Sequence, residues 1–589
     1  MNNSKINFRN RIDRAHVRAV FVSIAIALVC FALSPAVLAQ DGAVGDGTST
    51  AEGTGALGHL TSGNTDTAMG NLALGTVTTG SGNTAMGGKA LYSTNGSFNT
   101  ATGYGALYNS TADGDTANGF KALLNNTIGT QNTAVGFEAL FNNTGSGSNT
   151  AVGYQALFSN SNGGGSNVAV GDNALYSNTA TFNTALGSGS LTTNITGTNN
   201  TAVGADALSQ NIAGSNNTAT GVDALYENST GSSGGNDNTA TGVQALWLNN
   251  SGSQNTAVGS NALRGNTSAN FNTAIGFDAL YNNDSGSGNT ASGLNALFKN
   301  VSGASNTANG VDALYSNVSS GNNTAAGYAA LYSNTGGHNN TANGVDALVN
   351  NTNGSGNIAD GADALFANTS GSNNTAVGFN AGNKLTTGSN NIDIGANVSG
   401  VAGEANTIRV GKQGTQHATF IAGIFGTTVS GSTVVVNSSG RLGVASSSAR
   451  FKKAIKPMDK ASEAILALKP VRFRYKEEID PEVIPQFGLI AEEVEKVNPD
   501  LVGRDENGKV MTVRYDAVNA MLLNEFLKEH RKVEEQTRQI QEQEATITQL
   551  KKGIETVVAH LKEQDSKIEK VNAQFELANP KPKVVLNSQ

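Results

Sequence analysis

The chain has 589 residues, of which 72 are glycine, 8 are proline and only 14% are charged. Its low proline content excludes collagen and proline-rich linkers, and its low charge excludes a chain kept disordered by self-repulsion. The net charge of −8 is modest for this length, and no basic patch indicates nucleic acid as a partner. The bulky apolar residues of a large core are also missing, which favours a repetitive architecture.

The first segment, 1–39, has the pattern of an export signal. Basic residues precede an apolar run over 19–33, and small residues before Ala39 offer a cleavage position after it. The basic residues are Arg9, Arg11, Arg14 and Arg18. A retained membrane anchor is the alternative, but the run is shorter than the about 20 residues that a span needs. We therefore expect an exported chain that begins with a leader over 40–63, has no stable membrane span, and is secreted or held at the bacterial cell surface or outer envelope.

From 64 to 397 the sequence restates one phrase, roughly Asn-Thr-Ala-x-Gly-x-x-Ala-Leu-x-x-Asn. Fourteen of the nineteen intervals between successive glycines of this phrase, from Gly70 to Gly395, are seventeen residues long. Such regularity indicates that each repeat is one coil stacked on the next. Glycine and asparagine flank segments of four or five residues, which is turn chemistry, so the phrase predicts a β-solenoid or β-roll and not a helical repeat.

The predicted rod has a thin core. Twenty coils at about 4.8 Å each would measure about 95 Å, and each coil buries only two alanines and a leucine. Three chains side by side would supply the missing contacts, so we expect a homotrimer. We interpret the asparagines as turn formers or as a stacked side-chain ladder, and the aromatic residues after Ala-Leu as packing. If the rod binds surface glycans, exposed members of that aromatic row are the place: Tyr108, Phe141, Phe158, Tyr226, Trp247, Phe298 and Tyr315.

After 397 the phrase dissolves into strong β-formers bounded by glycine, which predict a β connector over 398–445. Beyond Arg441 charge rises and glycine falls, and a small α+β domain is expected over 446–515. Its predicted elements are helices at 461–469 and 492–497 and strands at 471–475 and 511–515.

A long helix is predicted to follow, with a coiled coil over 516–577 and a tail over 578–589. Apolar residues recur every seven positions along one seam, and a second seam is half polar. The first seam consists of Val533, Ile540, Ile547, Ile554, Leu561, Ile568 and Phe575. The six histidines are scattered and form no cluster with acidic residues or cysteine, so neither a metal site nor a cofactor is expected.

The candidate catalytic residues lie at the boundary between the predicted rod and the tail. Ser446 and Ser447 precede Arg450 and Lys452 in the run Ser-Ser-Ser-Ala-Arg-Phe-Lys-Lys. A lysine that is held neutral can act as the base for a serine nucleophile, and neighbouring cations such as Arg450 favour the neutral form. Spacing alone does not distinguish this arrangement from a serine loop followed by a basic patch.

The residues around this run resemble a known family. Ser447-x-x-Arg-Phe-Lys452, Leu468-Lys-Pro-Val-x-Phe-x-Tyr475, Gly488-Leu-Ile-Ala-Glu-Glu-Val494 and Tyr515 are similar to the intramolecular chaperone auto-processing domain of phage tailspikes and endosialidases, the family 74 serine autopeptidases. The resemblance implies a domain that trimerises, guides folding of the fibre before it and then cuts itself off. It implies Ser447 as nucleophile, Lys452 as its activator and Ser446–Ser447 as the scissile bond.

Two features depart from a simple match. Ser448 and Lys453 have the same spacing as Ser447 and Lys452, which leaves the register open by one residue. Glu492 stands where the family more often has glutamine, and its charge would favour a protonated lysine. The repeats, in turn, resemble the head repeats of trimeric autotransporter adhesins, although the period there is shorter.

Three functions are open at this point. The first is an exported trimeric surface fibre, adhesin-like, that is matured by its own autopeptidase. The second is the same fibre with an uncleaved tail that serves as a permanent trimerisation domain. The third is a tail-fibre-like protein that binds or depolymerises glycans, which the repeats support least because they carry no paired carboxylates and few basic residues.

Overall fold

The protein is described by a computed structural model, which covers residues 48–161, 163–231, 234–416, 418–422, 424, 430–431, 433–437, 439–505 and 507–569. The signal predicted over 1–39, the tail over 578–589 and the seam residue Phe575 lie outside these residues. The chain forms two compact units, Met1–Thr419 and Phe420–Gln589.

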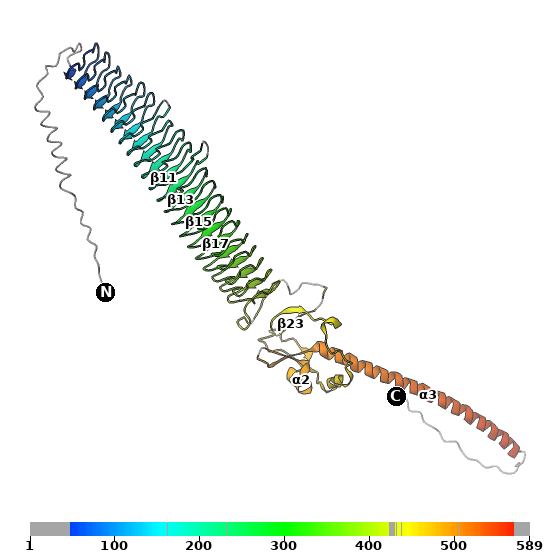
Figure 1. Cartoon of the computed structure of the whole chain (residues 1–589). Coiled ribbons are helices and arrows are strands. Elements are labelled where there is room, and N and C mark those ends of the chain that lie inside the picture. Colours follow the sequence, from blue (N-terminus) through cyan, green and yellow to red (C-terminus); the bar gives the residue numbers. More distant parts are fainter. Residues whose placement is uncertain are drawn as a thin grey trace, which may run out of the picture. The chain divides into compact units, whose positions relative to one another are not determined.

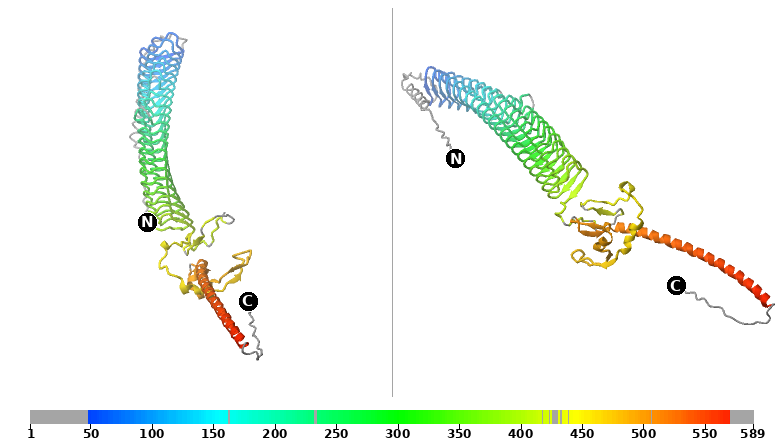
Figure 2. Two further views of the ribbon diagram at one scale, coloured as in Figure 1. Left: turned by 90° about the vertical axis from the view of Figure 1, so that its right-hand side faces the viewer. Right: turned by 60° about the horizontal axis from the view of Figure 1, so that its bottom comes forward.

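The first unit is a β-solenoid, as predicted. Each coil contributes one three-residue strand, and the strands stack in chain order into one parallel 22-stranded sheet (Figure 1). The strands are β1 Thr50–Glu52, β2 Thr67–Met69, β3 Thr84–Met86, β4 Thr100–Thr102, β5 Thr116–Asn118, β6 Thr133–Val135, β7 Thr150–Val152, β8 Val168–Val170, β9 Thr184–Leu186, β10 Thr201–Val203, β11 Thr218–Thr220, β12 Thr239–Thr241, β13 Thr256–Val258, β14 Thr273–Ile275, β15 Thr290–Ser292, β16 Thr307–Asn309, β17 Thr324–Ala326, β18 Thr341–Asn343, β19 Ile358–Asp360, β20 Thr375–Val377, β21 Ile392–Ile394 and β22 Ile408–Val410. We refer to residues 50–410 as the rod, whose coils form a long, gently curved stack (Figure 2).

Equivalent residues of successive coils lie directly over one another. In the coil of β6, Thr133 pairs with Thr150 of β7, Ala134 with Ala151 and Val135 with Val152. The middle alanine of each of these strands is buried, and the residues on either side of it face outward. The seventeen-residue period therefore sets the register, since a change of one residue would turn the alanine row outward.

Most coils also bury an alanine and a leucine in the turn, as the composition predicts. In the coil of β6, Ala134, Ala139 and Leu140 are fully buried. Leu140 has a φ of 53°, in the left-handed region that non-glycine residues seldom occupy. The same conformation recurs at the equivalent leucine of other coils. The stacking of the coils therefore imposes a left-handed conformation on these leucines, which the sequence does not predict.

Two rows of buried asparagine complete the core, and they confirm the interpretation of asparagine as a ladder. In the first row the N–H of Asn149 donates to Oδ1 of Asn132 at 3.0 Å. In the second row Nδ2 of Asn143 donates to Oδ1 of Asn126 and to the carbonyl of Ser146, both at 2.8 Å. The bonds between asparagines run from coil to coil, so a core with few large apolar residues still has most of its buried polar groups paired.

The glycine of the phrase is required by the close approach of successive coils. Gly136 has a φ of 141°, and a Cβ placed there would lie 2.2 Å from the carbonyl oxygen of Gly153. Both the backbone conformation and the space therefore exclude other residues.

The aromatic residues after Ala-Leu pack on one another, as predicted. The rings of Phe141 and Phe158 stack at 5.2 Å between centroids, and those of Phe158 and Tyr176 at 5.0 Å. Each ring therefore covers the face of its neighbour.

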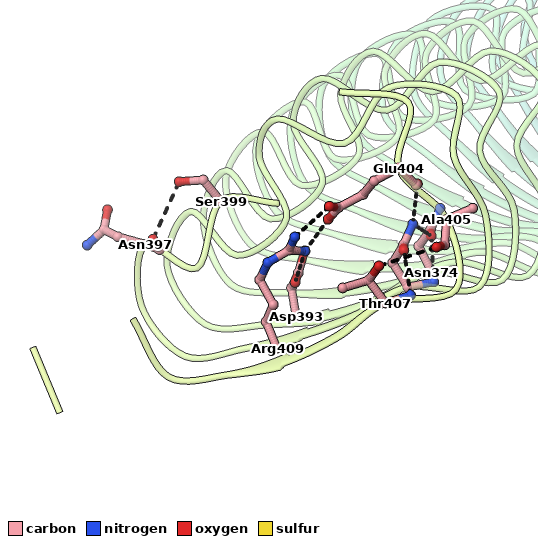
Figure 3. A network of polar contacts seen from close by, with 9 residues as sticks. Asn374, Asp393, Asn397, Ser399, Glu404, Ala405, Thr407 and Arg409 are labelled. Atoms are coloured by element: carbon pink, nitrogen blue, oxygen red, sulfur yellow. Dashed lines mark hydrogen bonds and ion pairs between the residues drawn. The ribbon is translucent and has the colours of Figure 1, made fainter. Parts of the chain in front are cut away.

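The rod ends in an ion-pair cluster in place of the alanine row (Figure 3). Asp393 occupies the alanine position in β21 and is fully buried, and Arg409 occupies it in β22. Nη1 of Arg409 lies 3.5 Å from Oδ1 of Asp393, and Nη2 donates to Oε2 of Glu404 at 2.5 Å. Burial raises the pKa of Asp393, and Arg409 opposes that rise. A charged pair at this position discourages the addition of a further strand to the sheet edge.

The second unit has three antiparallel hairpins and two α-helices among its described residues. The hairpins pair β23 Val434–Val436 with β24 Leu442–Val444, β25 Val471–Phe473 with β26 Gln486–Gly488, and β27 Val502–Arg504 with β28 Val510–Val513. The helices are α2 Ala491–Val497 and α3 Tyr515–Glu569, and the 3-10 helices are η1 Ala449–Phe451, η2 Asp459–Ala467 and η3 Pro499–Leu501. The helix predicted at 461–469 is thus a 3-10 helix over 459–467.

A small core joins α2, the β27–β28 hairpin and the start of α3. Its buried members are Val494, Leu501, Val502, Val513 and Met521. Helix α3 is 55 residues long and extends well beyond this core, and the described members of its predicted seam are exposed, with Ile540 at 54% and Ile547 at 51%.

Candidate self-processing site

The predicted site residues lie around a single turn of 3-10 helix. Ser446 and Ser447 precede η1, Ser448 is its N-cap and Lys452 is its C-cap. The N–H of Phe451 donates to the carbonyl of Ser448 at 3.1 Å, and that of Lys452 donates to the carbonyl of Ala449 at 3.0 Å. The three serines 446–448 therefore lie directly before this turn, and Lys452 lies directly after it.

These side chains face solvent in the single chain. Every residue from Ser446 to Lys452 is exposed, and among the described interactions no hydrogen bond or ion pair involves the Ser447 hydroxyl or the Lys452 ammonium. The guanidinium of Arg450 lies 4.6 Å from the centre of the Phe451 ring. The structure therefore gives the location of Ser447 and Lys452 without placing them in contact.

Glu492 lies in the first turn of α2 and is also exposed. No described contact joins it to Ser447, Arg450 or Lys452. Its segment is held by Tyr515 at the start of α3, whose hydroxyl oxygen accepts the N–H of Leu489 at 3.0 Å. A Cβ on Gly488 would lie 2.8 Å from that hydroxyl oxygen. Two motifs that are far apart in the sequence, 488–494 and Tyr515, are thus brought together.

A polar cluster that the sequence does not reveal fixes η2 to α3. The buried Ser462 donates from Oγ to Oε1 of Glu525 at 2.5 Å and accepts from Nδ2 of Asn524 at 2.7 Å. Lys528 lies 2.7 Å from Glu525, where its hydrogen bond lowers the pKa of Glu525 and raises its own. Glu525 and Lys528 have helical spacing, but Ser462 is 63 residues from Glu525, so only the fold brings them together.

Among the described residues, no group of histidine, cysteine, aspartate and glutamate side chains could hold a metal ion. None of the helices described is both long and apolar enough to cross a membrane.

Comparison with known proteins identifies the class of the tail. Residues 447–503 match the model of a serine peptidase family described as "Chaperone of endosialidase". The match begins at Ser447 and ends in β27, so it covers η1, η2, the β25–β26 hairpin and α2. The chain therefore combines a β-solenoid rod with a tail that carries an intramolecular chaperone region. Neither the curated proteins nor the solved structures include a match to this chain.

Proposed function

We propose that this protein is an exported, trimeric surface fibre, adhesin-like, whose C-terminal chaperone domain assists folding and then cuts its own chain between Ser446 and Ser447. The observation that carries the proposal is the start of the family match at Ser447, the residue that the sequence nominates as nucleophile. The fibre is the rod, and the tail serves to assemble it.

The proposed reaction needs only groups of this chain and water. Oγ of Ser447 attacks the carbonyl carbon of Ser446, and Nζ of Lys452 accepts the hydroxyl proton and passes it to the departing nitrogen of Ser447. The product is an ester between Ser446 and the Ser447 side chain, which water hydrolyses to a carboxylate and a free hydroxyl. Nucleophile and target share one chain, so proximity supplies much of the acceleration.

The exposure of the site in one chain supports coupling between cleavage and assembly. Lys452 must be neutral to accept a proton, and removal from water favours the neutral form of a lysine. Packing of neighbouring chains around η1 would desolvate it. The exposed seam of α3 supplies the means, because apolar residues every seven positions form a coiled coil when helices associate.

Expression of the full chain and of single variants tests the proposal on a denaturing gel. We expect a fragment of about 16 kDa, residues 447–589 of the 60.0 kDa chain, that is missing in Ser447→Ala and Lys452→Ala. Ser448→Ala and Lys453→Ala are the matched controls and should still be cleaved. If these two variants block cleavage instead, the register shifts by one residue.

A single uncleaved band from the unmodified chain would contradict self-processing. The tail would then be a permanent trimerisation domain, provided that the chain has the mass of three copies in solution.

A further inference from the structure

Two outward-facing rows run along the rod on either side of the repeat glycine. The strand row is the third residue of each strand, and the corner row is the residue directly after the glycine. Both rows stack coil on coil: Val135 pairs with Val152, and the carbonyl of Phe120 accepts the N–H of Glu138 in the next coil at 2.9 Å. Residues of the two rows in one coil are two positions apart, so their Cα atoms lie within about 7 Å.

In most coils where one row lacks a large apolar residue, the other row has one. In eight coils from β2 to β21 the corner residue alone is large and apolar: Thr102 with Tyr104, Asn118 with Phe120, Thr220 with Val222, Thr241 with Val243, Ser292 with Leu294, Asn309 with Val311, Ala326 with Tyr328 and Asn343 with Val345. In seven the strand residue alone is large and apolar: Met69 with Asn71, Met86 with Gly88, Val170 with Asp172, Leu186 with Ser188, Val203 with Ala205, Val258 with Ser260 and Ile394 with Ala396.

In four further coils both residues are large and apolar: Val135 with Phe137, Val152 with Tyr154, Ile275 with Phe277 and Val377 with Phe379. In one coil, with Asp360 and Ala362, neither is. The rod therefore carries an almost unbroken apolar stripe that no single row would reveal. We call the strand and corner rows together the glycine-flanking stripe.

The stripe is exposed, extensive and nearly uncharged. Eighteen of its side chains are between 37% and 55% exposed. With roughly 50–70 Å² each, they offer on the order of 1,000 Å² of apolar surface, above the about 800 Å² per partner of a standard interface. Asp172 and Asp360 are its only charged residues from β2 to β21. Single soluble chains seldom expose a continuous apolar surface of this size.

The geometry favours a partner with the same coil spacing. An identical rod keeps one side chain opposite another along the whole stripe, whereas a partner with another period would lose register after a few coils. With only these two aspartates in the stripe, identical surfaces would suffer little charge repulsion. A glycan fits poorly, because aromatic neighbours on the corner row, such as Phe120 and Phe137 at 5.1 Å between centroids, cover each other's ring faces.

We propose that the glycine-flanking stripe is the surface through which rods of identical chains pack in the fibre. This inference rests on the proposed trimer and adds to it the face that each rod turns toward its neighbours. The coiled coil would set the number of chains, and the stripe would set their rotation about the long axis.

Cysteine accessibility tests the proposal, since Cys30 is the chain's only cysteine. In a Cys30→Ser background, Leu294→Cys and Val311→Cys place a thiol on the stripe. Val301→Cys and Val318→Cys are matched controls at another position of the same coils. The single-chain exposures are comparable, at 44% and 37% for the stripe and 39% and 41% for the controls. Maleimide labelling is measured on folded protein whose mass has been determined by light scattering.

We expect labelling at the two stripe positions to be at least about tenfold slower than at the two controls. After unfolding, all four positions should be labelled at equal rates. Equal labelling in a folded preparation with the mass of three chains would overturn the stripe as the interface and leave the trimer intact. Equal labelling together with the mass of one chain would overturn the trimer as well.

Discussion

In the rod, each coil buries its own alanines, leucine and asparagines, and its hydrogen bonds continue into the next coil. In the C-terminal unit, five described apolar residues make up the buried core, while residues such as Phe487 at 81% and Met511 at 73% exposure remain open to solvent. The rod contains most of its stabilising contacts within one chain. The C-terminal unit shows apolar surface that only other chains or other segments can cover.

This difference indicates that the rod and the C-terminal unit have separate roles in folding and assembly. A solenoid is stabilised by neighbouring coils, so folding can spread along it once one part has formed. The repeat of the solenoid does not by itself determine how many chains associate or how their ends are aligned. The predicted seam of α3 would hold several chains together and align their ends, so we expect assembly to begin in the tail.

The largest expected effect comes from a charge in the predicted coiled-coil seam of α3. Ile547→Asp would bury a carboxylate in each of three helices, at a cost of several kcal/mol. We expect loss of the trimer and, with it, loss of cleavage at Ser447. Light scattering and a denaturing gel measure the two outcomes.

Ala545→Asp is the matched control, because it adds the same charge two residues away on the outer side of the predicted coil. A trimer that survives Ile547→Asp would show that α3 does not hold the chains together.

The next effect concerns the repeat glycine. Gly293 has a φ of 137°, and a Cβ would lie 2.4 Å from the carbonyl oxygen of Gly310. Gly293→Ala should lower the free energy of unfolding of the rod by about 4 kcal/mol or more. Gly231→Ala, where nothing lies within 4 Å of the added Cβ, should leave the melting temperature unchanged. Equal melting temperatures for the two variants would contradict the close coil contact.

A smaller loss is expected from the asparagine ladder. Nδ2 of the buried Asn283 donates to Oδ1 of Asn266 at 3.0 Å and to the carbonyl of Gly286 at 2.8 Å, and its Oδ1 accepts from Asn300 at 2.7 Å. Asn283→Ala removes these three buried hydrogen bonds and should cost about 2–4 kcal/mol. Its exposed neighbour Asn282 provides the control, and Asn282→Ala should cost well under half as much by denaturant unfolding.

The smallest effect is a pH dependence within the ladder. Asp115 takes the place of a buried asparagine, and burial raises its pKa to about 7. A raised folded-state pKa favours the protonated native form, so stability is lost as the pH rises through about 7. The rod should lose about 2–3 kcal/mol between pH 5 and pH 8 from this residue alone.

Asp115→Asn should remove the part of the pH dependence of stability that Asp115 causes. Asp113→Asn changes an exposed carboxylate and should largely keep that pH dependence. Burial raises the pKa of Asp66 and Asp393 in the same direction, so some slope remains in both variants. If Asp115→Asn left the pH dependence of stability unchanged, the result would contradict the claim that the buried Asp115 carboxyl causes it. Melting curves over this pH range provide the measurement.

The parts of the fold that repeat could be predicted from the sequence, because a seventeen-residue period determines which residues lie over one another. The strand alanine, the turn leucine and the asparagine ladder all follow from that period. The left-handed conformation of Leu140 and the pairing of Asp393 with Arg409 do not, since both depend on how coils close in space. In the tail, Ser447 could be nominated from a motif. The Ser462–Glu525 contact could not be found, because it joins segments that are distant in sequence.

The dependence of cleavage on chain concentration tests the central claim most directly. The scissile bond and its nucleophile belong to one chain, so an isolated chain would cut itself at a rate that dilution does not change. If the exposed Ser447 and Lys452 become competent only after three chains pack, cleavage during refolding should slow steeply over a hundredfold dilution. A cleavage rate that stays constant over that dilution would contradict the coupling of self-processing to assembly.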